Sequence, residues 1–106
     1  MEEEPNLNYI KELSGDNKDF EKKFITILTT EFPEEMQAYL VDISNNNLKD
    51  AAEMVHKLKH KFNILSLEKS YVFAVNHEEN LLAGNLEFHS EFRQILKKIE
   101  TYIKTI

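Results

Sequence analysis

The stretch that decides the fold reads Ala51-Ala52-Glu53-Met54-Val55-His56-Lys57-Leu58-Lys59-His60-Lys61-Phe62-Asn63-Ile64-Leu65. On a helical wheel with about 100° per residue, its apolar side chains gather on one broad side, namely Ala51, Met54, Val55, Leu58, Phe62 and Leu65. Such a stripe predicts an amphipathic helix that faces a core. His56 points almost directly away from the stripe, and Lys59 lies one turn further along. The pattern therefore predicts a histidine on the solvent side of a rigid element.

The composition favours a single helical domain. A chain of 106 residues is long enough for one hydrophobic core and leaves no room for a second domain. It contains only 2 glycines and 2 prolines, whereas a β-rich fold of this length needs many tight turns made by such residues. We therefore expect an all-α protein built from a few long helices.

Charge and residue usage argue against several classes of function. The net charge of −6 disfavours nucleic acid as a partner, because phosphate backbones are bound by basic surfaces. The absence of cysteine excludes disulfides and thiolate metal sites and is typical of a reducing compartment. No apolar run approaches the roughly 18 residues of a membrane span, and the acidic start, residues 1–5, does not resemble a signal peptide. We expect a cytoplasmic protein with no membrane partner, in which residues 1–5 form a flexible tail.

The spacing of apolar residues predicts five helices. A short helix ends near Leu13, before a break in which Asp16 is the expected N-cap of the next helix. Apolar residues then recur every three or four positions from residue 20 to residue 43, and Pro33 lies inside this pattern. Because the stripe keeps its phase across the proline, we expect one long kinked helix rather than two. The later helices are expected over 48–65, 68–82 and 86–102.

Short loops between long amphipathic helices make neighbouring helices antiparallel. The sequence therefore predicts an up-down-up-down four-helix bundle with a short extra N-terminal helix, and residues 1–106 form a single domain in this prediction. The helix faces are covered well enough in such a bundle that we expect a monomer.

His56 and Lys59 are the first candidates for chemistry. An imidazole is neutral for much of the time near pH 7, and its free nitrogen is a competent nucleophile toward an activated phosphoryl group. The product carries close to two negative charges, which an ammonium one turn away would stabilise. The alternative interpretation is that His56 is an ordinary surface residue beside lysines, since exposed histidines are common.

The same surface suggests two weaker interpretations. His56 and His60 are four residues apart, a spacing found in helical metal sites, with Glu53 or His77 as a third ligand. Nearby lysines oppose a dication, so we predict no metal site. The lysines also form a predicted basic patch that could steer an acidic partner; they are Lys57, Lys59 and Lys61.

The string His56-Lys57-Leu58-Lys59, followed by Leu65-Ser66-Leu67, resembles the signature of histidine-containing phosphotransfer (HPt) domains. That family shows a His, any residue, an apolar residue, a Lys and usually a Gly, with a Leu-Gly pair further on. Three other segments resemble the family's entry turn, its mid-helix break and the run-up to its histidine, namely Leu13-Ser14-Gly15-Asp16, Glu31-Phe32-Pro33-Glu34 and Asn47-Leu48-Lys49-Asp50-Ala51-Ala52. The similarity covers about residues 6–104 and favours phosphotransfer over an ordinary surface histidine.

The resemblance implies a phosphorelay carrier that works with response-regulator receiver domains or a hybrid histidine kinase. His56 would accept the phosphoryl group from an aspartyl phosphate and pass it to another receiver, while Lys59 would stabilise it. Many family members place a Gln or Glu near the active imidazole, and Glu78 is the nearest candidate. The receiver would bring Mg²⁺, so no cofactor is expected on this chain. The surface that docks the receiver would include Ala52, Lys57, His60 and Asn63.

The chain departs from the family pattern at two positions. His60 stands where the family usually has Gly, and an imidazole there narrows access, supplies a second donor to the phosphoryl oxygens, or disfavours transfer. Ser66 stands where the Leu-Gly pair has Gly, which is expected to change only how the helix ends. The alternative function is therefore a non-catalytic adaptor that keeps the HPt fold and binds receivers without transferring phosphate.

Overall fold

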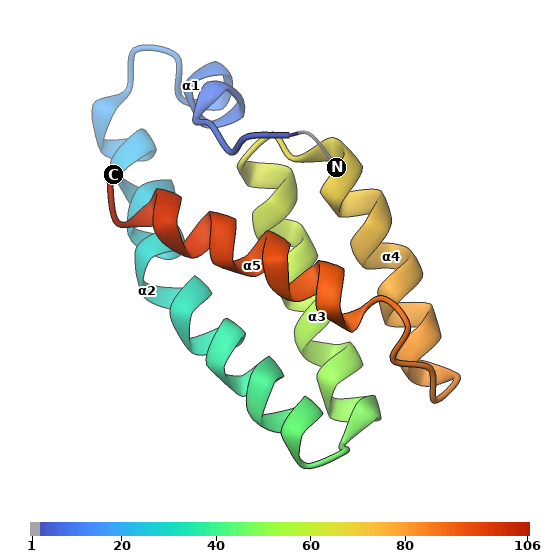
Figure 1. Cartoon of the computed structure of the whole chain (residues 1–106). Helices are drawn as coiled ribbons and strands as arrows, with labels where there is room; N and C mark the ends of the chain where they lie inside the picture. The colour runs from blue at the N-terminus through green and yellow to red at the C-terminus, as the bar shows by residue number, and fades with distance from the viewer. Residues whose placement is uncertain (1–2) are drawn as a thin grey trace.

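Five α-helices joined by short turns make up residues 3–106, the part of the chain that the computed structural model describes (Figure 1). Within this range there is no strand, so the all-α prediction is confirmed. The principal extents are 45 × 24 × 19 Å. The helices are α1 (Asn8–Ser14), α2 (Lys18–Ser44), α3 (Leu48–Ile64), α4 (Glu68–Leu82) and α5 (His89–Ile103).

The helix α3 lies at the centre of the arrangement. It runs between α2 and α4 in Figure 1, and its contacts with these two helices are the most extensive in the molecule. Helix α5 crosses the face of this layer, from the end of α4 toward the start of α2 (Figure 1). The short α1 lies at the end of the bundle where α3 turns into α4, and just before it the backbone N–H of Asn6 donates to the carbonyl of Leu65 at 3.0 Å.

The apolar stripe of α3 faces the core as predicted. Five of its six residues are fully buried, namely Ala51, Val55, Leu58, Phe62 and Leu65, whereas Met54 is only partly buried. The stripe of α2 supplies Leu28, Phe32, Met36 and Tyr39, and α5 supplies Phe92, Leu96 and Ile99. Burial of this stripe fixes the rotation of α3 about its axis, and with it the direction of the polar face.

Helix α2 is a single continuous helix through Pro33, so the prediction of one helix rather than two is confirmed. The proline side chain is exposed, and the missing N–H leaves one carbonyl of the preceding turn without its helical donor. The N-cap was predicted wrongly. Asn17, not Asp16, caps α2, because its side-chain oxygen accepts from the backbone N–H of Phe20 at 3.0 Å.

Three helices end with the same left-handed turn. Asn46, Ser66 and Gly84 have φ values of 58°, 66° and 80°. In each case the next residue donates its N–H to the carbonyl five residues earlier, at distances of 2.8 to 2.9 Å, from Asn47 to Asp42, from Leu67 to Phe62 and from Asn85 to Asn80. This hydrogen bond satisfies a carbonyl at the end of the helix and reverses the chain.

Helix α5 begins at His89, three residues later than predicted. The side chain of Asn85 accepts from the backbone N–H of Glu87 at 2.8 Å, which closes a local turn before the helix can start. Phe88 packs on Phe73 of α4 with ring centroids 5.0 Å apart. Apolar spacing alone could not separate this turn from the helix that follows it.

Residues 3–5, predicted to belong to a flexible tail, contact α4 and α5, while Met1 and Glu2 lie outside the described residues. Both carboxylate oxygens of Glu3 cap the start of α4, because they accept the backbone N–H groups of Lys69 and Ser70 at 2.8 Å. The Nζ of Lys98 on α5 donates to the carbonyl of Glu3 at 2.8 Å, and Pro5 is buried. This segment therefore ties α4 to α5.

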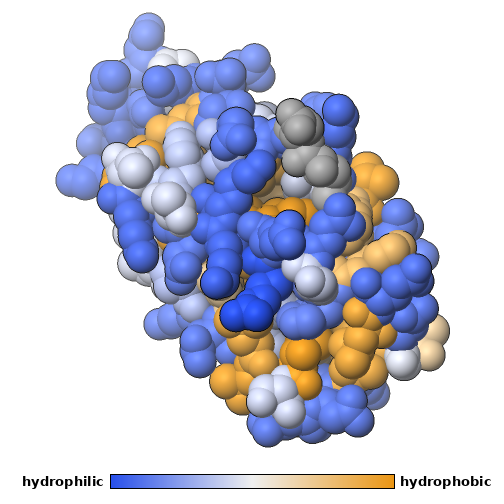
Figure 2. All heavy atoms as spheres, viewed as in Figure 1, coloured by the Kyte–Doolittle hydropathy of each residue, from blue (hydrophilic) through white to orange (hydrophobic). Residues whose placement is uncertain are grey.

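The face that carries α5 is mostly hydrophilic, with apolar side chains gathered toward the end where α2 meets α3 and α4 leads into α5 (Figure 2). Leu82 and Leu86 are exposed at this end of α4 and in the loop after it. Across residues 3–106, no helix is both long enough and apolar enough to cross a membrane.

Candidate functional site

His56 is presented to solvent by the middle of α3. Its side chain is 56% exposed, while Val55 and Leu58 on the opposite face are fully buried. The side chain therefore contributes little to the core, and the helix that carries it is held by packing on both flanks. This combination provides a free imidazole on a rigid support.

Glu78 of α4 connects His56 to Lys59. One carboxylate oxygen lies 3.3 Å from Nδ1 of His56, and the other accepts a hydrogen bond from Nζ of Lys59 at 2.9 Å. The side chains of Lys59 and Glu78 are only 12% and 20% exposed, so this ion pair is partly shielded from water. Of the residues predicted for the site, these three are brought together most closely.

The position of this carboxylate has a chemical consequence. A carboxylate beside one ring nitrogen favours the tautomer that carries its proton there. For His56 that nitrogen is Nδ1, so the proton is favoured on Nδ1 and the lone pair on Nε2. The ring is then oriented as a nucleophile, with its free nitrogen on the side away from Glu78.

His60 lies one turn further along α3 and is also exposed. Its ring meets that of His56 edge to face, with centroids 5.2 Å apart and an interplanar angle of 86°. The two imidazoles therefore share one patch of surface.

A shallow groove of about 350 Å³ runs beside His56 between α3 and α4. Ala52 was predicted to lie on the outer docking surface, but only 2% of it is exposed. It forms part of the groove wall instead. Sequence reasoning missed Leu82, which is 62% exposed and lies one turn after Glu78 on α4. The groove is lined by Lys49, Ala52, Glu53, His56, Lys57, Glu78 and Leu82.

The predicted basic patch of three lysines does not form. Lys61 is buried and binds Glu31 and Glu35 of α2 at 2.7 and 3.0 Å. Burial lowers the pKa of its ammonium, but the hydrogen bonds that it donates to these two carboxylates outweigh burial and raise the pKa. Lys59 is paired with Glu78, so Lys57 is the one member of the three that is exposed and makes no ion pair within residues 3–106. Asn63 is exposed, as predicted for the docking surface.

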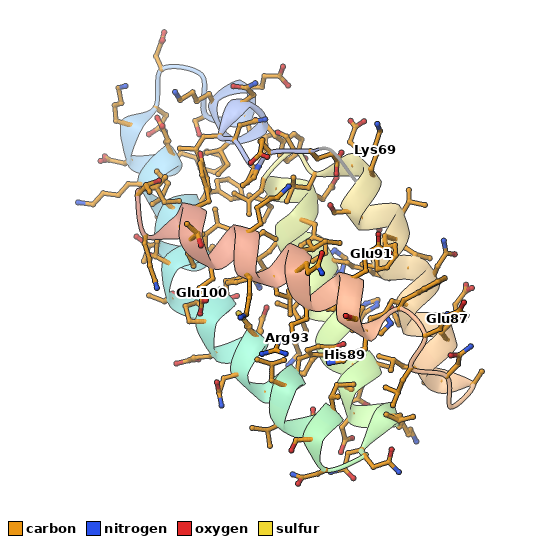
Figure 3. The ribbon with its side chains drawn as sticks, in the orientation of Figure 1. Lys69, Glu87, His89, Glu91, Arg93 and Glu100 are labelled. Carbon is orange, nitrogen blue, oxygen red and sulfur yellow. The ribbon has the colours of Figure 1, made fainter. Side chains whose placement is uncertain are left out.

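His77 does not approach His56 and instead lies in the core, fully buried. Its Nε2 lies 2.7 Å from the hydroxyl of Tyr39, which also lies 2.7 Å from Nδ1 of His89. In Figure 3, His89 lies at the start of α5 with Arg93 on the same edge of the helix. The three residues therefore form a polar cluster that joins α2, α4 and α5. The sequence did contain a signal for it, because His77 occupies a core position between Ala74 and Leu81.

The environment of this cluster shifts its ionisation. Burial, together with a smaller effect of the neighbouring His89, lowers the pKa of His77 from 6.5 to about 4. Burial also lowers the pKa of His89, with Arg93 acting in the same direction, and burial raises the pKa of Tyr39. All three side chains are therefore neutral at pH 7, which suits a hydrogen-bonded cluster in a core.

The described residues contain no group of three or more His, Asp or Glu side chains that could hold a metal ion. The arrangement around His56 can instead perform nucleophilic chemistry, because it combines an exposed imidazole, a carboxylate that orients it and an ammonium one turn away. Comparisons of the chain with protein-family models, with curated proteins and with solved structures found no significant match.

Proposed function

We propose that the protein is a phosphorelay carrier of the HPt type. It accepts a phosphoryl group on His56 from the aspartyl phosphate of a receiver domain and passes it to another receiver. The observation that supports this function most directly is the bridge made by Glu78, which lies 3.3 Å from Nδ1 of His56 and 2.9 Å from Nζ of Lys59. An ordinary surface histidine does not need its ring oriented by a partly buried ion pair.

In the proposed step, the lone pair on Nε2 of His56 attacks the phosphorus of the aspartyl phosphate. A nitrogen–phosphorus bond forms as the bond from phosphorus to the aspartate oxygen breaks, and the electron pair of that bond leaves with the receiver's carboxylate. The ring keeps its Nδ1 proton and becomes cationic, and the carboxylate of Glu78 beside that proton stabilises the charge. Passing the group to a second receiver reverses these changes.

The receiver supplies the acidic pocket and Mg²⁺ in this scheme, so the carrier's task is to position the imidazole and balance charge. The scaffold that we propose for it is an up-down-up-down bundle of α2, α3, α4 and α5, with α1 as a short extra helix. Such a carrier works as a cytoplasmic monomer whose partners are receiver domains or a hybrid histidine kinase. It binds neither nucleic acid nor membranes.

The test is phosphotransfer from a response-regulator receiver domain that has been phosphorylated on its aspartate. In the presence of Mg²⁺ we expect the chain to take up one acid-labile, base-stable phosphoryl group, mapped to His56 by mass spectrometry. His56→Gln should remain folded, because the side chain is exposed, and should take up none. Equal labelling of wild type and His56→Gln would show that the function is wrong, as would no labelling of either.

Lys59→Ala provides a second test of the same site. The variant should accept the phosphoryl group more slowly, because it lacks the ammonium beside the developing charge. Circular dichroism should show an intact helical fold, since the variant leaves the buried apolar face of α3 unchanged and a single substitution typically costs about 0.5–3 kcal/mol.

The adaptor function is the second candidate, and the contact between His60 and His56 favours it. If His60 blocks the receiver's pocket, the chain binds receivers without transfer, and His60→Gly should then switch transfer on at a cost of about 1 kcal/mol in helix stability. Transfer to the unmodified chain would exclude the adaptor.

A further inference from the structure

The cation that lies one helical turn from His56 is already paired in the proposed site. The ammonium of Lys59 is already neutralised by Glu78 at 2.9 Å, and the same carboxylate lies 3.3 Å from the ring of His56. A phosphoryl group adds close to two negative charges. It would therefore sit near a carboxylate, with the nearest cation already engaged, and it needs a further donor.

The geometry points to His60 as that donor. We infer that His60 binds the phosphoryl group of phosphorylated His56 by donating a ring N–H to one of its oxygens; the inference rests on the proposed function. The two rings are exposed and lie edge to face with centroids 5.2 Å apart. The phosphoryl oxygens are separated from Nε2 only by the phosphorus atom, and centroids 5.2 Å apart leave the N–H of His60 within reach of them.

The chemistry of the side chain suits this role. A neutral imidazole always carries one N–H donor, and a protonated imidazole carries two. His60 has no hydrogen-bond or ion-pair partner in the part of the chain that the structure describes, so its donor is not engaged elsewhere. With a glycine at this position, the phosphoryl oxygens would accept hydrogen bonds from water instead.

Lys57 tests the alternative that general positive charge, rather than a directed donor, stabilises the phosphoryl group. It is exposed, carries a full charge and lines the groove beside His56. It follows His56 directly in sequence, however, and adjacent residues of a helix do not face each other. If general positive charge stabilised the phosphoryl group, Lys57 would matter as much as His60.

A hydrogen bond to the phosphoryl oxygens should lengthen the life of the phosphorylated state. Hydrolysis of such groups passes through a loose transition state in which the oxygens carry less charge than in the bound group. A donor on these oxygens therefore stabilises the phosphohistidine more than the transition state. The lifetime of phosphorylated His56 thus reports on the contact without requiring a receiver.

The experiment uses the full chain phosphorylated with phosphoramidate, a small donor that labels histidine directly. Phosphate on His56 is followed by ³¹P NMR and mass spectrometry at pH 8 as it hydrolyses. Two variants separate the donor from the ring: His60→Gln keeps an N–H donor without the ring, and His60→Phe keeps the ring contact without a donor. We expect a lifetime near that of wild type in His60→Gln and about tenfold shorter in His60→Phe, as for the loss of one hydrogen bond to a charged group. Lys57→Ala tests the alternative of general positive charge, and a lifetime shortened as much as in His60→Phe would overturn the inference.

Long-range ¹H–¹⁵N NMR of His60 gives an independent readout, because its ring signals should shift when His56 is phosphorylated. Equal lifetimes in all variants would overturn the inference, as would a longer lifetime in His60→Phe or a failure of phosphoramidate to label His56. Failure of the proposed function has a different signature, namely a chain that phosphoramidate labels at His56 but that accepts nothing from a phosphorylated receiver.

Discussion

At the scale of single residues, Glu78 is the side chain on which the candidate site depends most. It lies on a different helix from His56 and Lys59, yet it contacts both, at 3.3 and 2.9 Å. The site is therefore made by the contact between α3 and α4 rather than by the histidine motif alone.

We expect Glu78→Ala to slow the proposed phosphotransfer to His56 by roughly tenfold to a hundredfold, because the ring loses the group that orients it. The ¹⁵N chemical shifts of His56 should show a larger share of the tautomer protonated on Nε2. Glu79→Ala is the matched control, since Glu79 is the exposed neighbour on the same helix. Equal rates for the two variants would contradict the positioning role.

Ser66 lowers the stability of the fold through the conformation of its backbone. It adopts φ of 66° in the turn after α3, in the left-handed region that glycine enters freely and serine does not. We expect Ser66→Gly to raise the free energy of unfolding by about 1 kcal/mol, measured by urea denaturation. Asn46→Gly is the control and should gain less, because asparagine tolerates the φ of 58° found there. A loss of stability in Ser66→Gly would disprove this account.

At the scale of elements, α4 is held at two points along its length. Glu3 caps its first turn and His77 anchors its middle to Tyr39. The anchor at His77 directly precedes Glu78, so the burial of one residue sets the direction of the next. The orientation of the site is thus transmitted by the backbone of α4.

The cap can be tested through Glu3. Its carboxylate accepts two backbone N–H groups and the hydroxyl of Ser70, so Glu3→Ala should cost about 1 kcal/mol of stability. Burial raises the pKa of Glu3, but the hydrogen bonds from Lys69 and Ser70 outweigh it and lower the pKa. The stabilisation by this cap is therefore fully present above the usual pKa of a glutamate, and it is lost as the pH falls through the lowered pKa of Glu3.

Glu4→Ala is the matched control, because the side chain of Glu4 is 81% exposed and makes only a 3.4 Å contact with Lys98. Urea denaturation of the two variants at pH 7 should separate them. A Glu3→Ala variant as stable as Glu4→Ala would mean that the cap contributes nothing.

At the scale of the whole molecule, the cluster of Tyr39, His77 and His89 joins three helices through one hydroxyl. It makes folding dependent on pH. His77 is neutral in the core with a pKa of about 4, against 6.5 when exposed, so the unfolded chain takes up a proton more readily than the folded one. The stabilisation that depends on neutral His77 is therefore fully present above about pH 6.5, and it is lost as the pH falls toward 4.

We expect acidification over that range to remove about 3 kcal/mol through His77, with His89 acting in the same direction because its pKa is also lowered. The free energy of unfolding should be measured at pH 7.5 and pH 4.5 in wild type and in His77→Phe. The variant should lose clearly less stability on acidification. A pH dependence identical to that of wild type would show that other groups are responsible.

Sequence by itself determined the elements and their inner faces. The spacing of apolar residues predicted five helices and the stripe of α3, because the period of a helix and the hydrophobic effect act locally along the chain. The same reasoning predicted that His56 faces the solvent, since a residue opposite the buried stripe of a helix points away from the core. The predicted end of α4 at residue 82 is confirmed, and the left-handed turn that follows it falls on Gly84.

Only the tertiary structure decided which polar groups meet. Glu78 reaches His56, Lys61 is drawn into the core by two carboxylates of α2, and Glu3 caps a helix that begins more than sixty residues later in the chain. Hydrogen bonds and ion pairs between helices depend on atoms a few ångströms apart, and no periodicity along the chain encodes those distances. The fold could be predicted from this sequence because its helices bury apolar stripes, whereas the surroundings of His56 depend on how α3 and α4 pack.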